Sequence, residues 1–278
     1  MNPPLVSVLM PAYNSEEFIG LAIESILNQT FTDFELIIID DHSVDKTWEI
    51  IKEYKKQDRR IIALRNENNL KICRTLNRGL DIAKGQLIAR MDADDWSYPE
   101  RLEKQVALME KDKAVVVSGA GIAVCDEKLQ IGSYRMYHES DNEIRQHLFR
   151  YSPFCHPVIM MRTEAVKNVS GYSVFLYDAE DYDLYFRLGL AGKFANLPDC
   201  LLKYRINSNS VSVKRARRQE KITLFIRLKA VYEYSYRMTS ADGIYFAGQL
   251  LSHYVIPPKA KIWLFNKIRN KNRSEYKK

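Results

Sequence analysis

Long apolar runs are missing from this chain of 278 residues. No stretch approaches the roughly 18–20 consecutive apolar residues that a helix needs to span a bilayer. The first residues, MNPPLVSVLMP, also lack the charged region and the small-residue cleavage site of a secretion signal. We therefore expect a cytoplasmic protein that is neither exported nor inserted across a membrane.

Cysteine is scarce, and glycine is absent where several nucleotide-binding loops need it. The four cysteines, Cys73, Cys125, Cys155 and Cys200, have no CxxC spacing, so we expect buried reduced thiols rather than disulfides or a zinc site. The segment PAYNSEE (11–17), after the first predicted strand, contains no glycine. A Rossmann dehydrogenase and a P-loop NTPase are thereby excluded, and a sugar-nucleotide-forming nucleotidyltransferase is disfavoured.

The net charge of +7 is unevenly distributed. Residues 214–278 contain 16 Lys and Arg against 4 Asp and Glu, whereas residues 1–213 contain 26 against 31. A basic segment of this kind fits an anionic partner, either a membrane surface or a nucleic acid. The rest of the chain is acidic and shows no nucleic-acid-binding module, so we expect no nucleic-acid partner.

The end of the chain mixes large apolar residues with lysines and arginines. The apolar members are Ile262, Trp263, Leu264, Phe265 and Ile268. This composition predicts a basic amphipathic helix in peripheral contact with anionic lipid on the inner face of the cell membrane. Packing of the same residues against the body of the protein is the alternative.

Short β-rich runs alternate with amphipathic stretches over the first 118 residues. Strands are predicted over 5–10, 34–40, 61–65, 86–92 and 114–120, and helices over 15–29, 45–57, 71–84 and 98–111. Several of the strands are apolar almost throughout, as a sheet covered on both faces requires. The series predicts an α/β fold with a doubly wound, mostly parallel sheet and helices on both faces.

The remainder of the chain changes pattern. We predict a helix near 140–149, a strand over 156–162, a helix over 178–192 and a late strand over 200–206. Two or three helices follow within 214–278, one of them over 215–237.

Polar segments follow three of the predicted strands, and two of these segments are acidic. The first strand leads into PAYN (11–14), the second into DDHSVD (40–45) and the fourth into DADD (92–95). Ligands of open α/β sheets bind at these carboxyl ends, where repulsion among the acids calls for a cation. PAYN alone could be a turn and DDHSVD a helix cap, but a cap explains only one acid of DADD. A divalent cation that holds a diphosphate resolves the repulsion.

Together these segments resemble the family 2 glycosyltransferases, which have the GT-A fold. The resemblance covers about 5–212. Its motifs include VSVLMPAYN (6–14), FELIIIDDHSVDKT (34–47), LIARMDADDWSYPERLEKQ (87–105) and EDYDLYFRL (180–188). It implies a GT-A domain over 1–213, with the nucleotide-sugar part in 1–118 and the acceptor and catalytic part in 119–213. Residues 214–278 are then a basic helical extension.

The resemblance also implies an activity. The chain would be an inverting transferase that uses Mn²⁺ or Mg²⁺ and moves a hexose or N-acetylhexosamine from a UDP-sugar. The acceptor would be a hydroxyl of a glycan or of a polyprenyl-diphosphate-linked sugar, in the assembly of capsule or lipopolysaccharide. A catalytically inactive subunit that binds nucleotide-sugars is the alternative.

The resemblance assigns the nucleotide pocket to the ends of the first two strands. Pro11, Ala12, Tyr13 and Asn14 would surround the base. Asp40 would accept the N3–H of uracil, which favours uridine over other bases.

Further donor contacts come from the third helix and from DADD. Lys71 and Arg74 would approach the phosphates with their charges. Asp92 would contact the ribose or the donor sugar, with Ala93 in the same nucleotide-sugar site. Asp94 would bind the metal ion, because a hard cation prefers oxygen ligands.

The acceptor side is assigned to residues later in the chain. Asp181 would be the general base that deprotonates the acceptor hydroxyl. Glu180 would orient or bind the acceptor, although acids in a first helical turn also complement the helix dipole. His156 would face the acceptor, and a hydrogen-bonded, partly buried histidine is the alternative.

Two positions depart from the family pattern. The family often has Tyr-Arg-x-His at the late strand, whereas this chain has Asn207 at the last position, which could offer the cation only a carbonyl oxygen. Lys71 stands where the family often has glycine, so this loop would approach the nucleotide through a side chain. Asp94 and Asp181 argue against an inactive subunit, while Asn207 leaves that alternative open.

Overall fold

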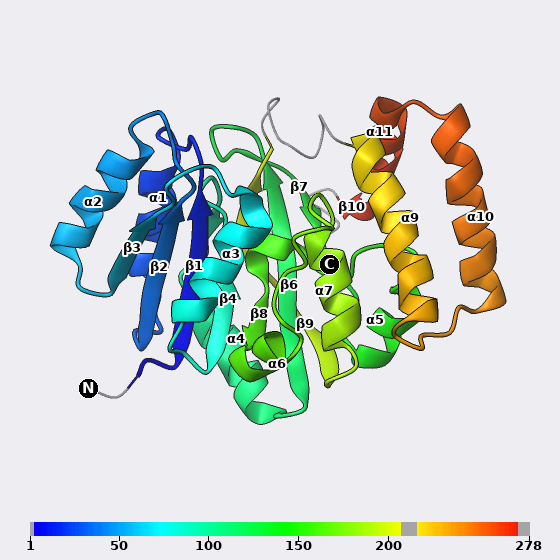
Figure 1. The fold of residues 1–278 in the computed structure, drawn as a ribbon, viewed down its shortest axis with the longest axis horizontal. Coiled ribbons are helices and arrows are strands. Elements are labelled where there is room, and N and C mark those ends of the chain that lie inside the picture. The colour runs from blue at the N-terminus through cyan, green and yellow to red at the C-terminus, as the bar shows by residue number, and fades with distance from the viewer. Residues whose placement is uncertain (1–2, 207–215, 272–278) are drawn as a thin grey trace.

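The computed structural model describes residues 3–206 and 216–271, which form a mixed sheet with helices on both faces (Figure 1). Its first half is parallel, in the order β3-β2-β1-β4. These strands are β1 (Val6–Ala12), β2 (Phe34–Asp40), β3 (Ile61–Arg65) and β4 (Leu87–Arg90). In the register of β1 and β2, Ala12 pairs with Asp40, so the loops after both strands start side by side. The predicted parallel α/β unit is confirmed.

The second half of the sheet is mostly antiparallel. Its strands are β5 (Trp96–Ser97), β6 (Val115–Cys125), β7 (Ile131–Arg135), β8 (Met160–Arg162), β9 (Lys193–Arg205) and β10 (Asn270–Lys271). β8 joins the halves by pairing antiparallel with both β4 and β6, and the long β9 runs parallel to β6. β5 pairs with β9, which brings the segment after DADD against the late strand.

The strand predicted over 156–162 is wrong in its first half. Residues His156–Val158 form a short 3-10 turn, and only Met160–Arg162 is a strand. Pro157 lies in that turn, and because proline has no N–H it cannot donate to a strand ladder.

Helices cover the two faces through two separate cores. On one face lie α1 (Ile19–Leu27), α2 (Thr47–Gln57) and α4 (Arg101–Lys111). On the other lie α3 (Lys71–Ile82), α5 (Asp141–His147), α6 (Thr163–Asn168), α7 (Glu180–Leu188) and α9 (Ala216–Tyr232). Alternate residues of β1 divide between the two cores, with Val8 and Met10 in the first and Leu9 in the second.

The C-terminal extension contributes to the second core. Ile226 and Ala230 of α9 are fully buried there. α9 also holds α7 through the buried Asp183, whose Oδ1 lies 3.2 Å from Lys229 Nζ and accepts a hydrogen bond from the Tyr234 hydroxyl at 3.1 Å. α9 therefore packs on the body of the protein.

The other two helices of the extension are more exposed. α10 (Ser240–Val255) runs antiparallel beside α9 at the edge of the molecule, and α11 (Pro258–Arg269) follows it (Figure 1). Leu251 of α10 is 70% exposed and Trp263 of α11 is 62% exposed. In the described part of the chain, no helix combines the length and the apolar character needed to cross a bilayer. The proposed domain boundary near 213 falls in 207–215, outside the described residues.

Candidate active site

A buried arginine stands where the parallel half of the sheet ends. Arg90 is the last residue of β4 and is 5% exposed. Its Nη2 lies 2.5 Å from Asp92 Oδ1, while its Nε and Nη1 are buried without a hydrogen-bond partner among the described residues. The sequence reasoning missed Arg90, for which the only signal was a charge that ends an apolar strand.

The charge of Arg90 acts on two acidic segments that are far apart in the sequence. Burial raises the pKa of Asp94 and of Asp181, and in both cases the charge of Arg90 opposes that rise. It also opposes the rise in the pKa of the neighbours Asp95 and Glu180. Arg90 contacts Asp92 directly and influences the Glu180–Asp181 pair through its charge.

Three carboxylates of DADD form a compact group, here called the acidic triad: Asp92, Asp94 and Asp95. Their nearest oxygens all lie within 4.8 Å of one another. Burial and then the neighbouring carboxylates raise the pKa of Asp94 to about 6 and that of Asp95 well above its ordinary value. Asp95 Oδ2 is buried and has no hydrogen-bond partner among the described residues. An oxygen-only set with an unsatisfied carboxylate oxygen fits a hard divalent cation.

Asp95 is a member that the sequence reasoning did not assign to the metal. Its other oxygen, Oδ1, accepts a hydrogen bond of 2.8 Å from the backbone N–H of Arg205. The Arg205 side chain donates from Nε to the Asp94 carbonyl at 2.6 Å and stacks 4.4 Å from the centre of the Phe18 ring. The end of β9 therefore fixes the DADD loop. Asn207, the other predicted metal ligand, lies outside the described residues.

The second acidic segment opens α7. Asp181 Oδ1 accepts a hydrogen bond of 2.8 Å from the Tyr182 N–H, and Glu180 Oε2 accepts one of 2.9 Å from the Asp178 N–H. Burial and then Asp181 raise the pKa of Glu180 to about 7. Asp178 has a φ of 86°, a left-handed conformation that costs a non-glycine residue roughly 1–2 kcal/mol. Such strain is retained where the surrounding structure fixes a functional loop.

His156 joins this site as a neutral side chain. Its Nε2 lies 2.8 Å from the hydroxyl of Tyr172. Burial and then the charge of Arg90 lower the pKa of His156 well below its ordinary value. His156 is therefore hydrogen-bonded and partly buried. This is the environment expected under the alternative to a role facing the acceptor.

The PAYN segment combines a turn with an exposed ring. Pro11 and Ala12 are buried in β1, whereas Tyr13 is 49% exposed. Asn14 has a φ of 49°, and its Oδ1 accepts a hydrogen bond of 3.0 Å from the N–H of Val44. The loop after β1 is therefore tied to the loop after β2, and Tyr13 offers its ring at that junction.

Asp40 is placed at the same junction but below the surface. It is fully buried, and its Oδ2 lies 3.0 Å from Arg65 Nε. Its neighbour Asp41 accepts hydrogen bonds from the N–H groups of Leu70 at 2.7 Å and Lys71 at 2.9 Å. The second acid of this Asp-Asp pair therefore fixes the start of α3, a role that the sequence reasoning did not identify.

Lys71 and Arg74 lie exposed on the first turn of α3. Lys71 has a φ of 68°, in the left-handed region that glycine adopts without strain. This backbone conformation explains why glycine suits the position.

Replacing Lys71 with glycine is expected to raise the free energy of unfolding by about 1 kcal/mol, because it relieves this conformation. Lys71→Ala is the control, since it removes the same charge but keeps a Cβ. Urea unfolding of both variants measures the difference. Equal stability of the two variants would contradict the explanation.

Comparisons with known proteins were consistent with one another. A profile described as Glycosyl transferase family 2 matches residues 7–170. The putative glycosyltransferase EpsE of Bacillus subtilis is 36% identical, over 98% of this chain and 96% of its own. The UDP-Glc:alpha-D-GlcNAc-diphosphoundecaprenol beta-1,3-glucosyltransferase WfaP of Escherichia coli is 34% identical, over 81% of this chain and 88% of its own.

The fold also matches a solved structure. TarS 1–349 of S. aureus in complex with UDP-GlcNAc superposes with a TM-score of 0.68 and 20% identity, over 93% of this chain and 74% of TarS 1–349. At this level of identity the likeness concerns the fold.

Proposed function

Because the chain belongs to glycosyl transferase family 2, we propose that it moves a hexose or N-acetylhexosamine from a UDP-sugar to an acceptor hydroxyl. The acidic triad at the end of β4, together with the Glu180–Asp181 pair at the start of α7, carries this proposal. Such a site has one acidic group for a cation and another for a proton, as transfer from a sugar diphosphate requires.

The donor would lie across the carboxyl ends of β1, β2 and β4. Tyr13 would contact the base, Lys71 and Arg74 the phosphates, and Asp92 the ribose or sugar. The buried Asp40 would accept the N3–H of uracil once its ion pair with Arg65 opens. The acidic triad would hold Mn²⁺ or Mg²⁺, which stabilises the charge that develops on a departing diphosphate. The unpartnered Asp95 Oδ2 supports this assignment.

The acceptor would be activated by Asp181. A carboxylate with a raised pKa is a suitable general base near neutral pH. Attack of the acceptor oxygen on the anomeric carbon, opposite the departing UDP, gives a single displacement. The product therefore has the inverted anomeric configuration.

One relative supports a proposal for the acceptor class. WfaP is named for a sugar linked to diphosphoundecaprenol. We infer that this chain acts on a similar glycan or polyprenyl-diphosphate-linked acceptor in surface-polysaccharide biosynthesis, at the inner face of the cell membrane.

The basic extension 214–278 would provide peripheral contact with anionic lipid there. Its exposed apolar residues, including Trp263 and Leu264, support this contact. Replacing both with serine is expected to abolish flotation with phosphatidylglycerol vesicles. Leu190→Ser is the control, because Leu190 is 61% exposed on the body. Equal flotation of all variants would contradict lipid contact by these residues.

Release of UDP from a panel of UDP-sugars with Mn²⁺ tests the proposed activity. One donor is expected to be hydrolysed slowly without acceptor, and chelation of the metal is expected to stop the reaction. Tight UDP binding without turnover of any donor, even with lipid-linked acceptors, would favour the inactive binding subunit. Absence of both binding and turnover would overturn the proposal.

A further inference from the structure

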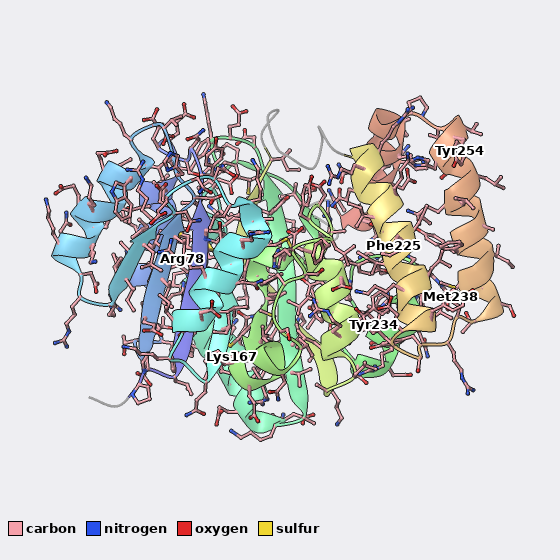
Figure 2. All side chains as sticks on the ribbon, in the orientation of Figure 1. Arg78, Lys167, Phe225, Tyr234, Met238 and Tyr254 are labelled. Carbon is pink, nitrogen blue, oxygen red and sulfur yellow. The ribbon has the colours of Figure 1, made fainter. Side chains whose placement is uncertain are left out.

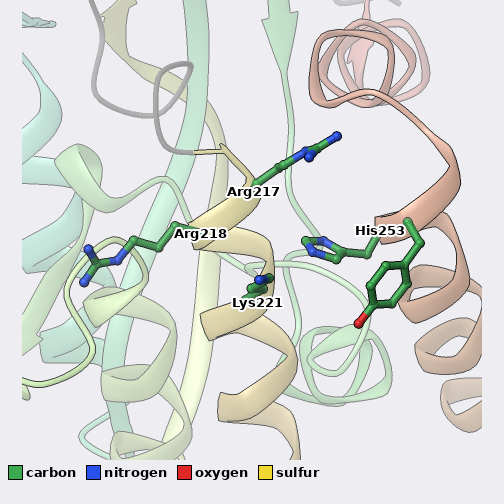
Figure 3. A pocket seen from close by; sticks show the side chains of 5 residues that line it. Arg217, Arg218, Lys221 and His253 are labelled. Carbon is green, nitrogen blue, oxygen red and sulfur yellow. The ribbon is translucent and has the colours of Figure 1, made fainter.

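A cavity of about 490 Å³ opens beside α9, and basic side chains dominate its lining. It is called here the basic pocket and is lined by Arg217, Arg218, Lys221, His253 and Tyr254 (Figure 3). The first three come from the start of α9, and the last two from the end of α10.

The basic pocket has an excess of positive charge. Arg217 and Lys221 are exposed, and neither has an ion-pair partner among the described residues. The nearby Glu220 does not balance them, because its carboxylate lies 2.7 Å from His253 Nδ1 and 2.6 Å from Lys261 Nζ. The pocket can therefore accept an anion without displacing an internal carboxylate from these cations.

The basic pocket is linked directly to the loop that presents the predicted base. Arg218 Nε lies 3.0 Å from Asp178 Oδ2, and its guanidinium lies 4.0 Å from the centre of the Tyr177 ring. Asp178 in turn donates its N–H to Glu180, the residue beside Asp181. In Figure 3, Arg218 extends to the opposite side of α9 from Arg217, which reaches toward α10 and α11.

The surroundings of the basic pocket fit an amphiphile better than a free anion. Tyr254 lines the pocket together with these cations and is 79% exposed, so its ring offers an apolar surface there. A ligand with an anionic head in the pocket could lay an apolar chain against this ring. The donor does not satisfy this description, because its diphosphate is assigned to the acidic triad.

We propose that the basic pocket binds the diphosphate of a polyprenyl-diphosphate-linked acceptor, with Arg217 and Lys221 contacting its phosphates. Guanidinium and ammonium groups form strong charge-assisted hydrogen bonds with phosphate oxygens. A diphosphate held there would direct the attached sugar toward the loop that carries Glu180 and Asp181. This inference rests on the proposed function and names the part of the acceptor that the extension recognises.

Binding of farnesyl diphosphate to the full chain tests the inference. The titration is done with saturating UDP and Mn²⁺, so that the donor site cannot take up the probe. Wild-type protein is expected to bind the probe, and the double variant Arg217→Ala/Lys221→Ala is expected to bind it about ten- to a hundredfold more weakly. Farnesol, which lacks the diphosphate, is expected not to bind.

Arg237→Ala is the matched control. Arg237 is an exposed residue in the turn between α9 and α10. It lies at the Met238 end of this helix pair, opposite the end marked by Tyr254 (Figure 2). The substitution removes one positive charge from the same extension, where the double variant removes two, and is expected to leave farnesyl diphosphate binding unchanged.

The outcomes separate the inference from the function on which it rests. The proposed role of the basic pocket would be overturned if the wild type and the double variant bound the probe equally. An equal loss of probe binding in Arg237→Ala would also overturn it. Farnesol binding as tight as farnesyl diphosphate binding would do the same. Binding only to phosphatidylglycerol vesicles would replace the acceptor with a membrane surface. If UDP itself fails to bind the wild type, the proposed function is what fails.

Discussion

Replacing Asp181 with asparagine is expected to lower the rate of sugar transfer by about 10²–10⁴-fold, the usual contribution of a positioned general base. The asparagine keeps the size of the side chain and can still accept the hydrogen bond from the Tyr182 N–H. It cannot take the proton of the acceptor hydroxyl. Binding of UDP with Mn²⁺ is expected to persist, because the acidic triad is unchanged. Steady-state kinetics and calorimetry on the same preparation measure the two effects.

Glu180→Gln is the informative control for this variant. The rate is expected to rise with pH above the range in which an ordinary aspartate ionises, because burial raises the pKa of Asp181 and the base must be unprotonated. The glutamine can still accept the hydrogen bond from the Asp178 N–H and leaves the base in place, so most of the rate is expected to remain. If Glu180→Gln were as inactive as Asp181→Asn, the assignment of Asp181 as the base would be wrong.

Replacing Asp94 with asparagine is expected to lower activity by about 10²-fold or more and to remove its dependence on Mn²⁺. The physical reason is the loss of one charged ligand from the acidic triad, which weakens binding of the ion that stabilises the leaving diphosphate. Activity measured against Mn²⁺ concentration, with and without a chelator, gives the result.

Asp81→Asn makes the same chemical change at an exposed position near the end of α3. It is expected to keep both the activity and the metal dependence of the wild type. If Asp94→Asn retained full metal-dependent turnover, the acidic triad would not be the metal site.

The sequence was sufficient to predict the framework of the site. Apolar runs placed β1, β2, β3 and β4, and the motifs singled out Asp94 and Asp181. Both kinds of signal are local, because a buried parallel strand or an acidic strand end can be recognised from about ten consecutive residues.

What the sequence did not reveal depends on contacts between distant segments. Arg90 appeared as the last residue of a strand, and only the fold shows its ion pair with Asp92 and its two buried nitrogens without a partner among the described residues. Asp95 is a candidate metal ligand because one of its carboxylate oxygens has no partner among the described residues. Asp41 fixes the start of α3 because its carboxylate accepts hydrogen bonds from two backbone N–H groups. The basic pocket needs α9 and α10 side by side, so no single motif contains it.

We assign metal-dependent binding of UDP to the acidic triad and proton transfer to Asp181, and one measurement tests this division. UDP is titrated calorimetrically into the wild type, Asp94→Asn and Asp181→Asn, each with Mn²⁺. We expect the wild type and Asp181→Asn to bind UDP with similar affinity and Asp94→Asn to lose metal-dependent binding. Equal binding by all three proteins, or loss in Asp181→Asn as large as in Asp94→Asn, would contradict the assignment of the two acidic groups to separate tasks.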